Sequence, residues 1–296
     1  MRSNSFTINR IPGAFRRVFG LYLAIFLVVT TASAQRIAVL TPADNDQSSS
    51  FVSDLKASLG KKLPLLDDEL SFSAFRSVNP ETPFNMTMET GMQIGEVIGC
   101  QYFVLIKTGT SRRFSLEKPP YFEAHAAVFV VSSRTGRLVF WRMQSLEAPE
   151  AKQSEALLAA SAPLLATEMA EKLKQVRVAE LAENPAARIE EIPAPDLPEA
   201  KNFRPPMPYK RIKPEYTTTA YLYSVTATVD ALLDVDQNGN ILRIEIARWA
   251  GYGLDEAVIE AIRKMNWRPG EKNGKTLPVR VLLRYNFKKI DKEPER

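Results

Sequence analysis

One stretch of the sequence matches a calcium-binding loop letter for letter. Asp234, Asp236, Asn238, Gly239 and Glu245 fall on the pattern D-x-[DN]-x-[DN]-G-x5-E, in which oxygen ligands surround the cation. Such a loop lies between two helices, whereas both flanks here alternate apolar and polar residues, as strands do. Asn-Gly is also the pair that tight hairpin turns prefer, so the sequence favours a hairpin and predicts no metal site.

The other reactive side chains do not combine into a catalytic group. His125 is the only histidine and Cys100 the only cysteine, so zinc sites built from several such ligands are excluded. Neither residue has a partner for nucleophilic catalysis at a recognisable spacing. Asp67, Asp68 and Glu69 are adjacent, but no nucleophile or partner acid accompanies them. We therefore expect no enzyme activity and no cofactor.

The first 34 residues are typical of a bacterial export signal. They contain four arginines and no acidic residue, an apolar run over residues 18–29, and a small-x-small site that ends at Ala34. The run is shorter than the roughly 20 residues that span a bilayer, which favours cleavage after Ala34 over retention as an anchor. Cleavage would leave 35 basic and 34 acidic residues, so charge gives no support for binding nucleic acid.

Residues 36–178 alternate between strand and helix patterns. A short apolar strand begins at Ile37, a helical stripe follows over residues 51–63, and a second helix is expected to end at Gly99. Residues 100–107 predict a buried strand, residues 121–131 and 137–143 a strand pair, and residues 154–175 a closing helix. This order predicts an α/β domain with a mixed sheet.

The phrases RIAVLTP, LPLLDDELSFSAF, IGEVIGCQYFVLIKTG and VVSSRTGRLVFWR run through this domain in that order. Together they resemble the periplasmic α/β domains of the TolB amino-terminal and CsgG or LpoB type. In those families a later pair of strands brackets a Thr-Gly turn. The resemblance covers residues 36–178 and implies an exported domain.

Residues 181–214 lose periodicity and contain eight prolines among charged residues. Such a segment does not build a core and favours an extended, semi-rigid backbone, so a linker is expected here. Beyond it, residues 225–235 and 241–247 alternate in polarity around the Asn-Gly pair, as in a hairpin.

Residues 251–274 read as one short amphipathic helix between strands. Leu254, Val258, Ile262 and Met265 lie on one helical face, and Pro269 ends the helix. Residues 277–287 alternate again as a third strand. The whole chain is therefore predicted to be α+β, with a carboxy-terminal ββαβ domain over residues 215–289 that has a three-stranded antiparallel sheet, and a charged tail over residues 290–296.

KPEYTTTA, VDQNGNI, GLDEAVIEAIRKMNWRPG and VRVLLRYNF follow one another in this domain. This ordered set resembles the TonB carboxy-terminal domain over residues 207–289, with Trp267 and Pro269 at the aromatic-x-Pro position of the family. Two departures affect the loops: the usual Tyr-Pro is Tyr216-Thr217 here, and the glycine before the first strand is absent.

The TonB resemblance implies a periplasmic module that binds an extended segment of an outer-membrane transporter by strand addition. A small sheet has open edges whose N–H and C=O groups can pair with such a segment. The receiving edge would be the last strand, through Val279, Val281, Leu283, Tyr285 and Phe287. The alternative is that another copy of the domain, or a neighbouring segment, closes this edge.

Three interpretations of the whole chain follow from this resemblance. The favoured one is a periplasmic, non-enzymatic protein that binds an outer-membrane transporter or another envelope protein. The second is an energy transducer anchored in the inner membrane, but the anchor histidine of TonB transducers is missing, since His125 lies far from the amino terminus. The third is an assembly factor in which the TonB-like module forms homodimers. Membrane association is expected only if residues 1–34 are retained.

Amino-terminal sequencing of the protein from separated envelope fractions tests the signal prediction. We expect a chain that starts at Gln35 in the soluble envelope fraction, because a short apolar run before a small-x-small site is cleaved. A chain that keeps Arg2 to Ala34 in the inner-membrane fraction would support the anchored transducer instead.

Overall fold

The computed structural model describes residues 36–42, 49–183, 189–194 and 196–289. All of these residues belong to one contiguous unit, Gln35–Arg296. The predicted export signal and the charged tail lie outside the described residues. Among the helices that are described, none has both the length and the apolar character needed to cross a bilayer.

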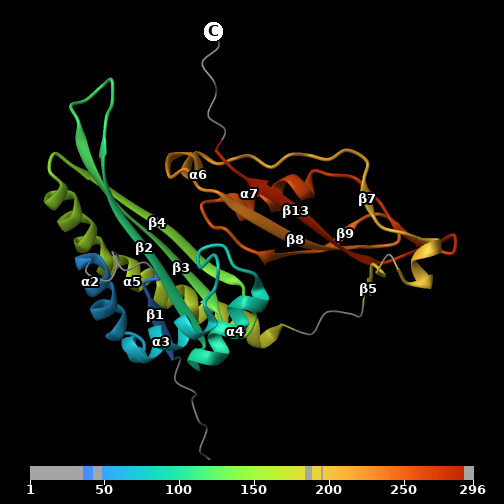
Figure 1. Ribbon diagram of the computed structural model, residues 1–296, viewed down its shortest axis with the longest axis horizontal. Helices are drawn as coiled ribbons and strands as arrows, with labels where there is room; N and C mark the ends of the chain where they lie inside the picture. Colours follow the sequence, from blue (N-terminus) through green and yellow to red (C-terminus); the bar gives the residue numbers. More distant parts are fainter. Residues whose placement is uncertain (1–35, 43–48, 184–188, 195, 290–296) are drawn as a thin grey trace, which may run out of the picture. The chain divides into compact units, whose positions relative to one another are not determined.

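The first sheet contains four strands in the order β1-β2-β3-β4 (Figure 1). β1 (Ile37–Leu40) lies parallel to β2 (Tyr102–Arg113), whereas β2, β3 (Tyr121–Ser132) and β4 (Leu138–Ala148) are antiparallel neighbours. The mixed sheet predicted for the amino-terminal half is therefore confirmed. β2 buries every side chain from Tyr102 to Ile106, because helices cover both faces of the sheet at this point.

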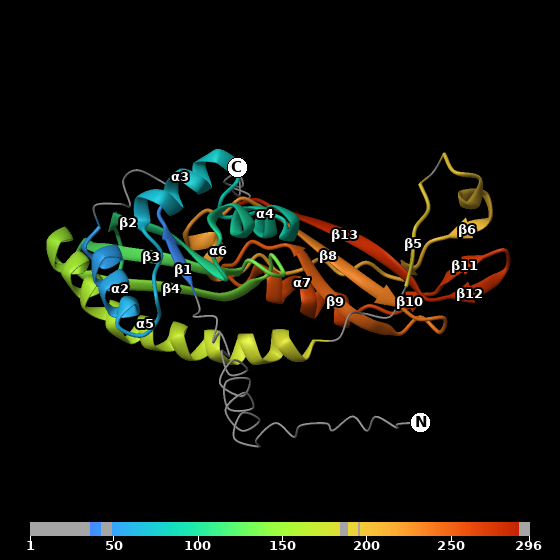
Figure 2. The same ribbon diagram turned by 90° about the horizontal axis from the view of Figure 1, so that it is seen from below.

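Two pairs of helices provide that cover (Figure 2). α2 (Ser50–Gly60) and the long α5 (Ala151–Ala182) pack on one face, in the same apolar cluster as Val104 and Ile106 of β2. α3 (Asp68–Val78) and α4 (Met88–Ile98) lie on the other face, with Phe103 and Leu105. The alternation of side chains along β2 thus divides the domain into two core layers.

The helix boundaries are predicted in part. α4 ends at Gly99, as expected, and that glycine has a φ of 73° in the left-handed region. α5 is longer than the predicted 154–175, and the sequence patterns miss α3 altogether. The side chain of Asp67 accepts a hydrogen bond from Leu70 N (2.9 Å), and two acidic residues follow in the first turn of α3. The adjacent carboxylates at 67–69 therefore begin a helix.

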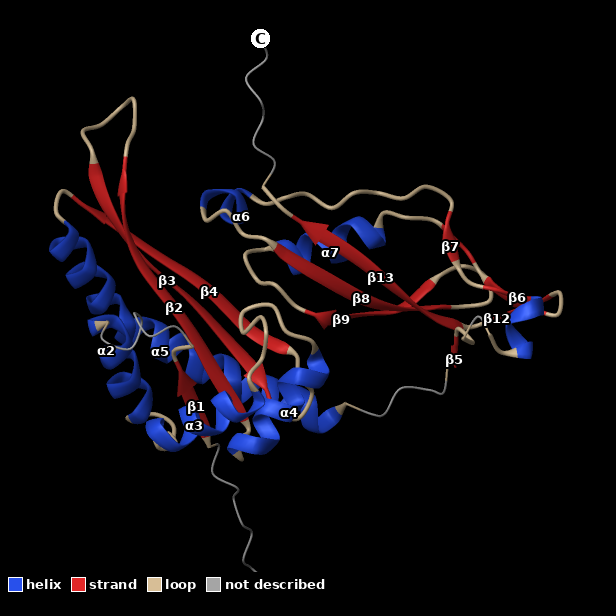
Figure 3. Cartoon of the chain, in the orientation of Figure 1, coloured by secondary structure: helices blue, strands red, loops and turns tan. Residues whose placement is uncertain are grey.

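The second sheet has the predicted ββαβ order. β8 (Ala227–Val235), β9 (Ile241–Arg248) and β13 (Val279–Phe287) are antiparallel in the order β13-β8-β9, and α7 (Leu254–Arg263) connects β9 to the strands that follow (Figure 3). Leu254, Val258 and Ile262 of α7 are fully buried in the core that the sheet forms. A short fourth strand, β5 (Glu190–Glu191), pairs in parallel with the start of β13.

Two Asn-Gly turns in this half differ in geometry. At the tip of the β8–β9 hairpin only Gly239 has a positive φ, of 86°, so this is not the tight turn that Asn-Gly predicts, in which both central residues have a positive φ. The carboxylate of Asp236 accepts backbone hydrogen bonds from Asn238 and Asn240 (both 2.8 Å) and makes a wider turn. The second turn, between β11 (Gly270–Lys272) and β12 (Lys275–Leu277), has positive φ at both Asn273 and Gly274.

The segment predicted as a linker contains short paired elements. α5 extends to Ala182, and the 3₁₀ helix η3 (Pro198–Asn202) precedes β6 (Phe203–Arg204), which pairs with β11. β7 (Met207–Pro208) pairs with β10 (Trp267–Arg268). The helix α6 (Thr218–Leu222) follows and leads into β8. Parts of residues 181–214 are thus held against the carboxy-terminal strands, while the domain boundaries themselves stay a prediction.

A cluster of aromatic rings joins the two sheets. Phe129 of β3 lies 5.7 Å from Trp249 and 5.9 Å from Tyr252, measured between ring centroids, and Trp141 of β4 lies 5.4 Å from Tyr252. Trp249 is only 1% exposed. The turn between these rings passes through Gly251, whose φ is 69° and whose absent Cβ would come within 2.7 Å of both Phe129 and Trp141. The two halves of the chain therefore share one apolar core.

Polar contacts support this junction. The side-chain amide of Asn85 donates to the carbonyls of Thr228 (2.8 Å) and Trp249 (2.6 Å), and its oxygen accepts from Thr228 N (2.9 Å). Tyr223, before β8, donates its hydroxyl proton to Glu123 of β3 (2.6 Å). Burial raises the pKa of Tyr223 to about 12, and the neighbouring Glu123 adds to this increase, so the phenol stays a donor at neutral pH.

Replacing Gly251 by alanine should destabilise the whole described unit. The new methyl group would meet two rings and also require a left-handed backbone, so we expect a loss of about 2–4 kcal/mol in the free energy of unfolding. Gly274 also has a positive φ but has no atom within 4 Å of the Cβ position, so Gly274→Ala is the matched control and should lose only about 1 kcal/mol. Urea unfolding measures both, and equal losses would contradict a tightly packed junction.

Candidate functional site

The five side chains predicted to bind a partner all lie in the core. Each of them is at most 9% exposed, and they share the face of β13 that packs toward α7: Val279, Val281, Leu283, Tyr285 and Phe287. They stand opposite the buried residues of β8, for example Leu283 opposite Ala231. A partner at this edge would therefore meet the backbone of β13 and the alternate residues Arg280, Leu282 and Arg284 on the other face.

The backbone edge of β13 is only partly occupied. β5 pairs with Val279 and Arg280 on the side away from β8, and no other strand of the described chain pairs with β13 on that side. Residues 281–287 therefore present backbone N–H and C=O groups at a sheet edge. Such an edge can accept another strand.

Ion pairs cover the face of the sheet opposite α7. Arg280 makes two hydrogen bonds to Asp234 (2.7 and 2.9 Å), and Arg284 makes two to Asp230 (2.7 and 2.9 Å). Arg248 of β9 also reaches Asp230 at 3.3 Å. Burial would raise the pKa of Asp230, but these two arginines outweigh it and hold the pKa below its ordinary value. The charged ladder fixes the register between β8, β9 and β13.

Residues before α6 pack against the end of β13. The guanidinium carbon of Arg211 lies 5.6 Å from the centroid of the Tyr285 ring, and the ring of Tyr216 is stacked 6.3 Å from that of Phe287. Tyr216 donates its hydroxyl proton to the carbonyls of Ala220 (3.1 Å) and Val225 (2.7 Å). These contacts involve side chains, so the segment lies beside β13 without forming a paired strand on it.

The threonine that replaces the usual proline after Tyr216 has a structural role. The hydroxyl of Thr217 accepts a hydrogen bond from Ala220 N (3.2 Å) as the N-cap of α6 and donates one to the carbonyl of Tyr252 (2.6 Å). Proline has no hydroxyl and could make neither bond. This departure from the family pattern therefore connects α6 to the junction between the sheets.

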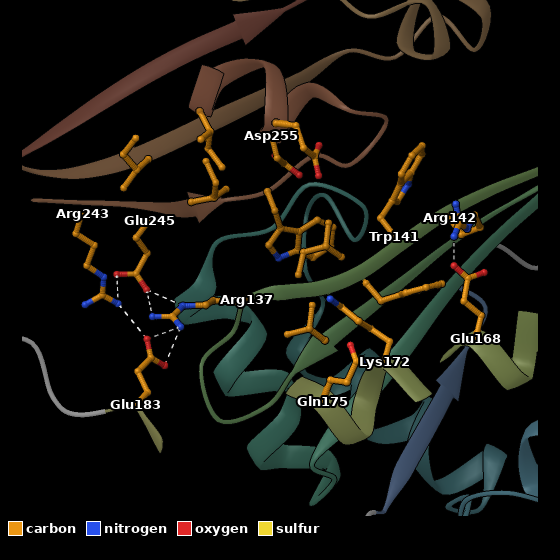
Figure 4. A pocket seen from close by; sticks show the side chains of 18 of the residues that line it. Arg137, Trp141, Arg142, Glu168, Lys172, Gln175, Glu183, Arg243, Glu245 and Asp255 are labelled. Carbon is orange, nitrogen blue, oxygen red and sulfur yellow. Dashed lines mark hydrogen bonds and ion pairs between the residues drawn. The ribbon is translucent and has the colours of Figure 1, made fainter. Parts of the chain in front are cut away.

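A groove of about 780 Å³ lies between β4 of the first sheet and β9 of the second (Figure 4). One side of Figure 4 shows a four-residue cluster in which Arg137 is bonded to Glu183 and Glu245, and Arg243 also reaches both acids. The other side shows the pair of Arg142 and Glu168. α5 contributes Lys172 and Gln175 between these charges. No local sequence pattern marks this groove, because Arg137 and Glu245 are far apart in the chain.

A buried acid lines the same groove. The carboxylate of Asp255, in the first turn of α7, accepts hydrogen bonds from Ala250 N (2.9 Å) and Gly251 N (2.8 Å). Burial nevertheless raises the pKa of Asp255 to about 7, and the charge of Glu256 acts in the same direction. Asp255 therefore holds the turn at Gly251 from the first turn of α7.

The residues considered first for chemistry have structural roles. Asp236 shapes the hairpin turn, while Asp234 and Glu245 pair with arginines, so the calcium-loop pattern lies on a hairpin as predicted. Cys100 is buried, which raises the pKa of its thiol above the ordinary value. His125 packs against the ring of Tyr223, 4.8 Å between centroids. Within the described ranges, no three or more His, Cys, Asp or Glu side chains gather in a way that could hold a metal ion.

The order β8, β9, α7, β13, with a three-stranded antiparallel core, is the arrangement that the sequence resemblance implied. Residues 212–288 match the family described as Gram-negative bacterial TonB protein C-terminal. The predicted resemblance over 207–289 is thus confirmed, and we call residues 212–288 the TonB-like domain. The family match covers this domain and leaves the first sheet outside it.

Solved structures similar to this chain include the TonB carboxy-terminal domain of Pseudomonas aeruginosa. The match has 18% identity and a TM-score of 0.26, and it covers 36% of this chain and 100% of that one. The match to the LpoB C-terminal domain from Salmonella enterica has 14% identity and a TM-score of 0.25, and it covers 42% of this chain and 91% of that one. The match to a hypothetical protein of Chlamydia trachomatis has 15% identity and a TM-score of 0.30, and it covers 51% of this chain and 99% of that one. No curated protein matches the sequence.

Asp255 should make the protein less stable as the pH rises. Its carboxyl ionises near the ordinary value of 3.8 in the unfolded chain and near about 7 in the folded one. Between these values the unfolded chain has lost a proton that the folded protein keeps, so the free energy of unfolding falls with rising pH and levels off above about 7. Asp255→Asn removes this contribution.

Urea unfolding of the wild type and of Asp255→Asn at about pH 5 and about pH 8 checks the sign. The free energy of unfolding of the variant, relative to that of the wild type, should be higher at about pH 8 than at about pH 5. A difference that is the same at both pH values would show that Asp255 does not titrate in this range.

Proposed function

We propose that this chain is an exported protein of a bacterial envelope that binds a partner protein through its TonB-like domain. Binding occurs by strand addition to the free part of β13, residues 281–287, and involves no catalysis. The partner is an outer-membrane transporter or another envelope protein with an extended segment. The protein acts in the periplasm after removal of its export signal.

One observation carries this proposal. β13 has no backbone partner beyond Arg280 on the side away from β8 within the described chain, and this open edge belongs to a domain that matches the TonB C-terminal family. Buried side chains on one face of β13 and ion pairs on the other hold the strand in fixed register. A rigid edge accepts an extended peptide with little further ordering.

The composition supports binding rather than catalysis. The reactive side chains considered above are engaged in turns, helix caps and core packing. The charge left after removal of the export signal is close to neutral, so general attraction to nucleic acid has no basis in this sequence.

Photocrosslinking from position 282 tests the proposal in cells. Leu282 lies on β13, is 49% exposed and points away from the buried face, so a photoreactive residue there should not disturb the core. We expect a crosslink to an envelope protein, with the attachment mapped to an extended segment of that partner. Leu164 is 75% exposed on α5, which packs on the first sheet, so the same residue at 164 is the matched control and should give no such product.

Two results would contradict this proposal. A crosslink from position 282 only to a second copy of the same chain would support the dimerising alternative. Equal labelling of the same partners from positions 282 and 164 would show contact without selectivity for the edge of β13.

A further inference from the structure

The TonB-like domain has a second open edge. β9 is the last strand of its sheet, opposite the edge that β13 forms, and among the described residues it pairs along its length only with β8. Its other described backbone contacts lie at its end, where Arg248 forms an isolated bridge with Thr87 and Trp249 N donates to the carbonyl of Met86 (3.4 Å). Residues 241–247 of β9 therefore present unpaired backbone groups on their outer side.

A second free edge lies across the groove from β9. β4 is the last strand of the first sheet and pairs only with β3 in the described chain. Residues 137–142 at the start of β4 and residues 243–246 of β9 line the same cavity, with α5 side chains between them.

The two faces of β9 differ in polarity along this groove. Ile244 and Ile246 stand opposite Leu233 and Ala231, so they lie on the face that α7 covers, and they are only half-buried. Ile259 of α7 is half-buried beside them and also lines the cavity. Arg243 and Glu245 lie on the opposite face of β9 and are bound in the charged cluster with Arg137. A strand added to β9 would thus continue an apolar face and a charged face.

We propose that this groove binds an extended segment of a partner protein as an additional strand on β9. The segment has alternating apolar and polar residues, with the apolar ones toward Ile244, Ile246 and Ile259. The charged side chains of the segment lie toward Arg243 and Glu245. The free edge of β4 and the polar side chains of α5 form the other walls around the bound strand.

A single strand fits this site better than a second copy of the chain. Pairing of β9 with β9 of another molecule would bring a whole sheet with its helix into a groove already bordered by β4 and α5. An isolated extended segment needs only the spacing of about 5 Å from β9 that sheet hydrogen bonds require. The site is thus specific for a peptide in extended conformation.

This inference goes beyond the proposed function, because β9 and β13 are opposite edges of one sheet. A partner at β13 would leave the β9 groove free, so the same chain could hold two segments at once. An experiment that finds no binding at one of these two edges therefore does not contradict binding at the other.

Hydrogen–deuterium exchange of the chain from Gln35, with the whole described unit present, tests the groove. The probe is a capped nine-residue peptide of alternating valine and threonine with a lysine at each end, supplied at millimolar concentration. We expect exchange to slow by about tenfold over residues 241–248, because new backbone hydrogen bonds form there, and this result does not depend on whether exchange over residues 281–287 slows as well. The control peptide carries a proline at its centre and should slow exchange at neither edge.

Two results of this measurement would overturn the proposal. One is slower exchange confined to residues 281–287, which would support the β13 site and exclude β9. The other is unchanged exchange over residues 241–248 at the highest peptide concentration.

A charge on the apolar face gives an independent test. Ile246→Lys should weaken binding of the valine–threonine peptide by at least about tenfold, because the ammonium group would face the apolar residues of the peptide. Leu164→Lys, at an exposed position of α5 outside the groove, is the matched control and should leave the affinity unchanged. If Ile246→Lys does not fold, Ile246→Thr should still weaken binding measurably, and unchanged affinity in a folded variant at position 246 would overturn the proposal.

Discussion

The turn at Gly251 is the contact on which the arrangement of both sheets depends. It begins three residues after β9 ends and passes between Phe129 of β3 and Trp141 of β4, where only a residue without a side chain fits. Trp249 and Tyr252 fill the space on either side, and Asp255 holds the turn by accepting two of its backbone hydrogen bonds. Because Trp141 belongs to β4, the same contact places the free edges of β4 and β9 along one groove.

The two edges of the sheet in the TonB-like domain, β13 and β9, are covered in different ways. β5 covers the start of β13, and side chains from residues 209–216 flank the other end, so the backbone edge is open over residues 281–287. No described residue covers the edge of β9 in this way along residues 241–247, but this edge faces a groove instead of bulk solvent. The partial cover of β13 and the groove along β9 both limit unselective pairing between chains, which exposed sheet edges otherwise favour. The edges remain accessible to a segment that is narrow and already extended.

Sequence patterns predicted elements whose residues carry their own local signals. The strands of both sheets follow apolar alternation, α7 follows its buried stripe, and α4 ends at a glycine that adopts a left-handed conformation. α3 was missed because its start depends on a capping aspartate, Asp67, whose role is hard to separate from that of the two acids beside it. The hairpin turn at Gly239 was only half predicted, since Asp236 reshapes it through side-chain bonds. Family resemblance assigned the receiving edge to β13, but the burial of the five side chains predicted to bind the partner appears only when the sheet is built.

The groove and the junction could not be predicted from local patterns. Arg137 meets Glu245, and Asn85 meets Thr228, only after more than a hundred intervening residues have folded. No local pattern in the sequence marks these pairs, and Trp141 and Trp249 read as ordinary apolar residues within or beside strands. The chemistry of the groove thus arises from how the two halves of the chain meet.

The burial of Trp249 has a consequence for work with fragments. A fragment that begins near residue 212 would keep the TonB-like sheet and helix but lose Phe129, Trp141 and Asn85, which cover the junction side of this domain. Trp249 and Tyr252 would then face solvent as an apolar patch that the intact chain does not expose, and such patches attract unrelated proteins. Some proteins captured by the fragment would therefore bind this artificial surface. Those proteins can be recognised because a chain that also contains residues 36–183 would no longer capture them.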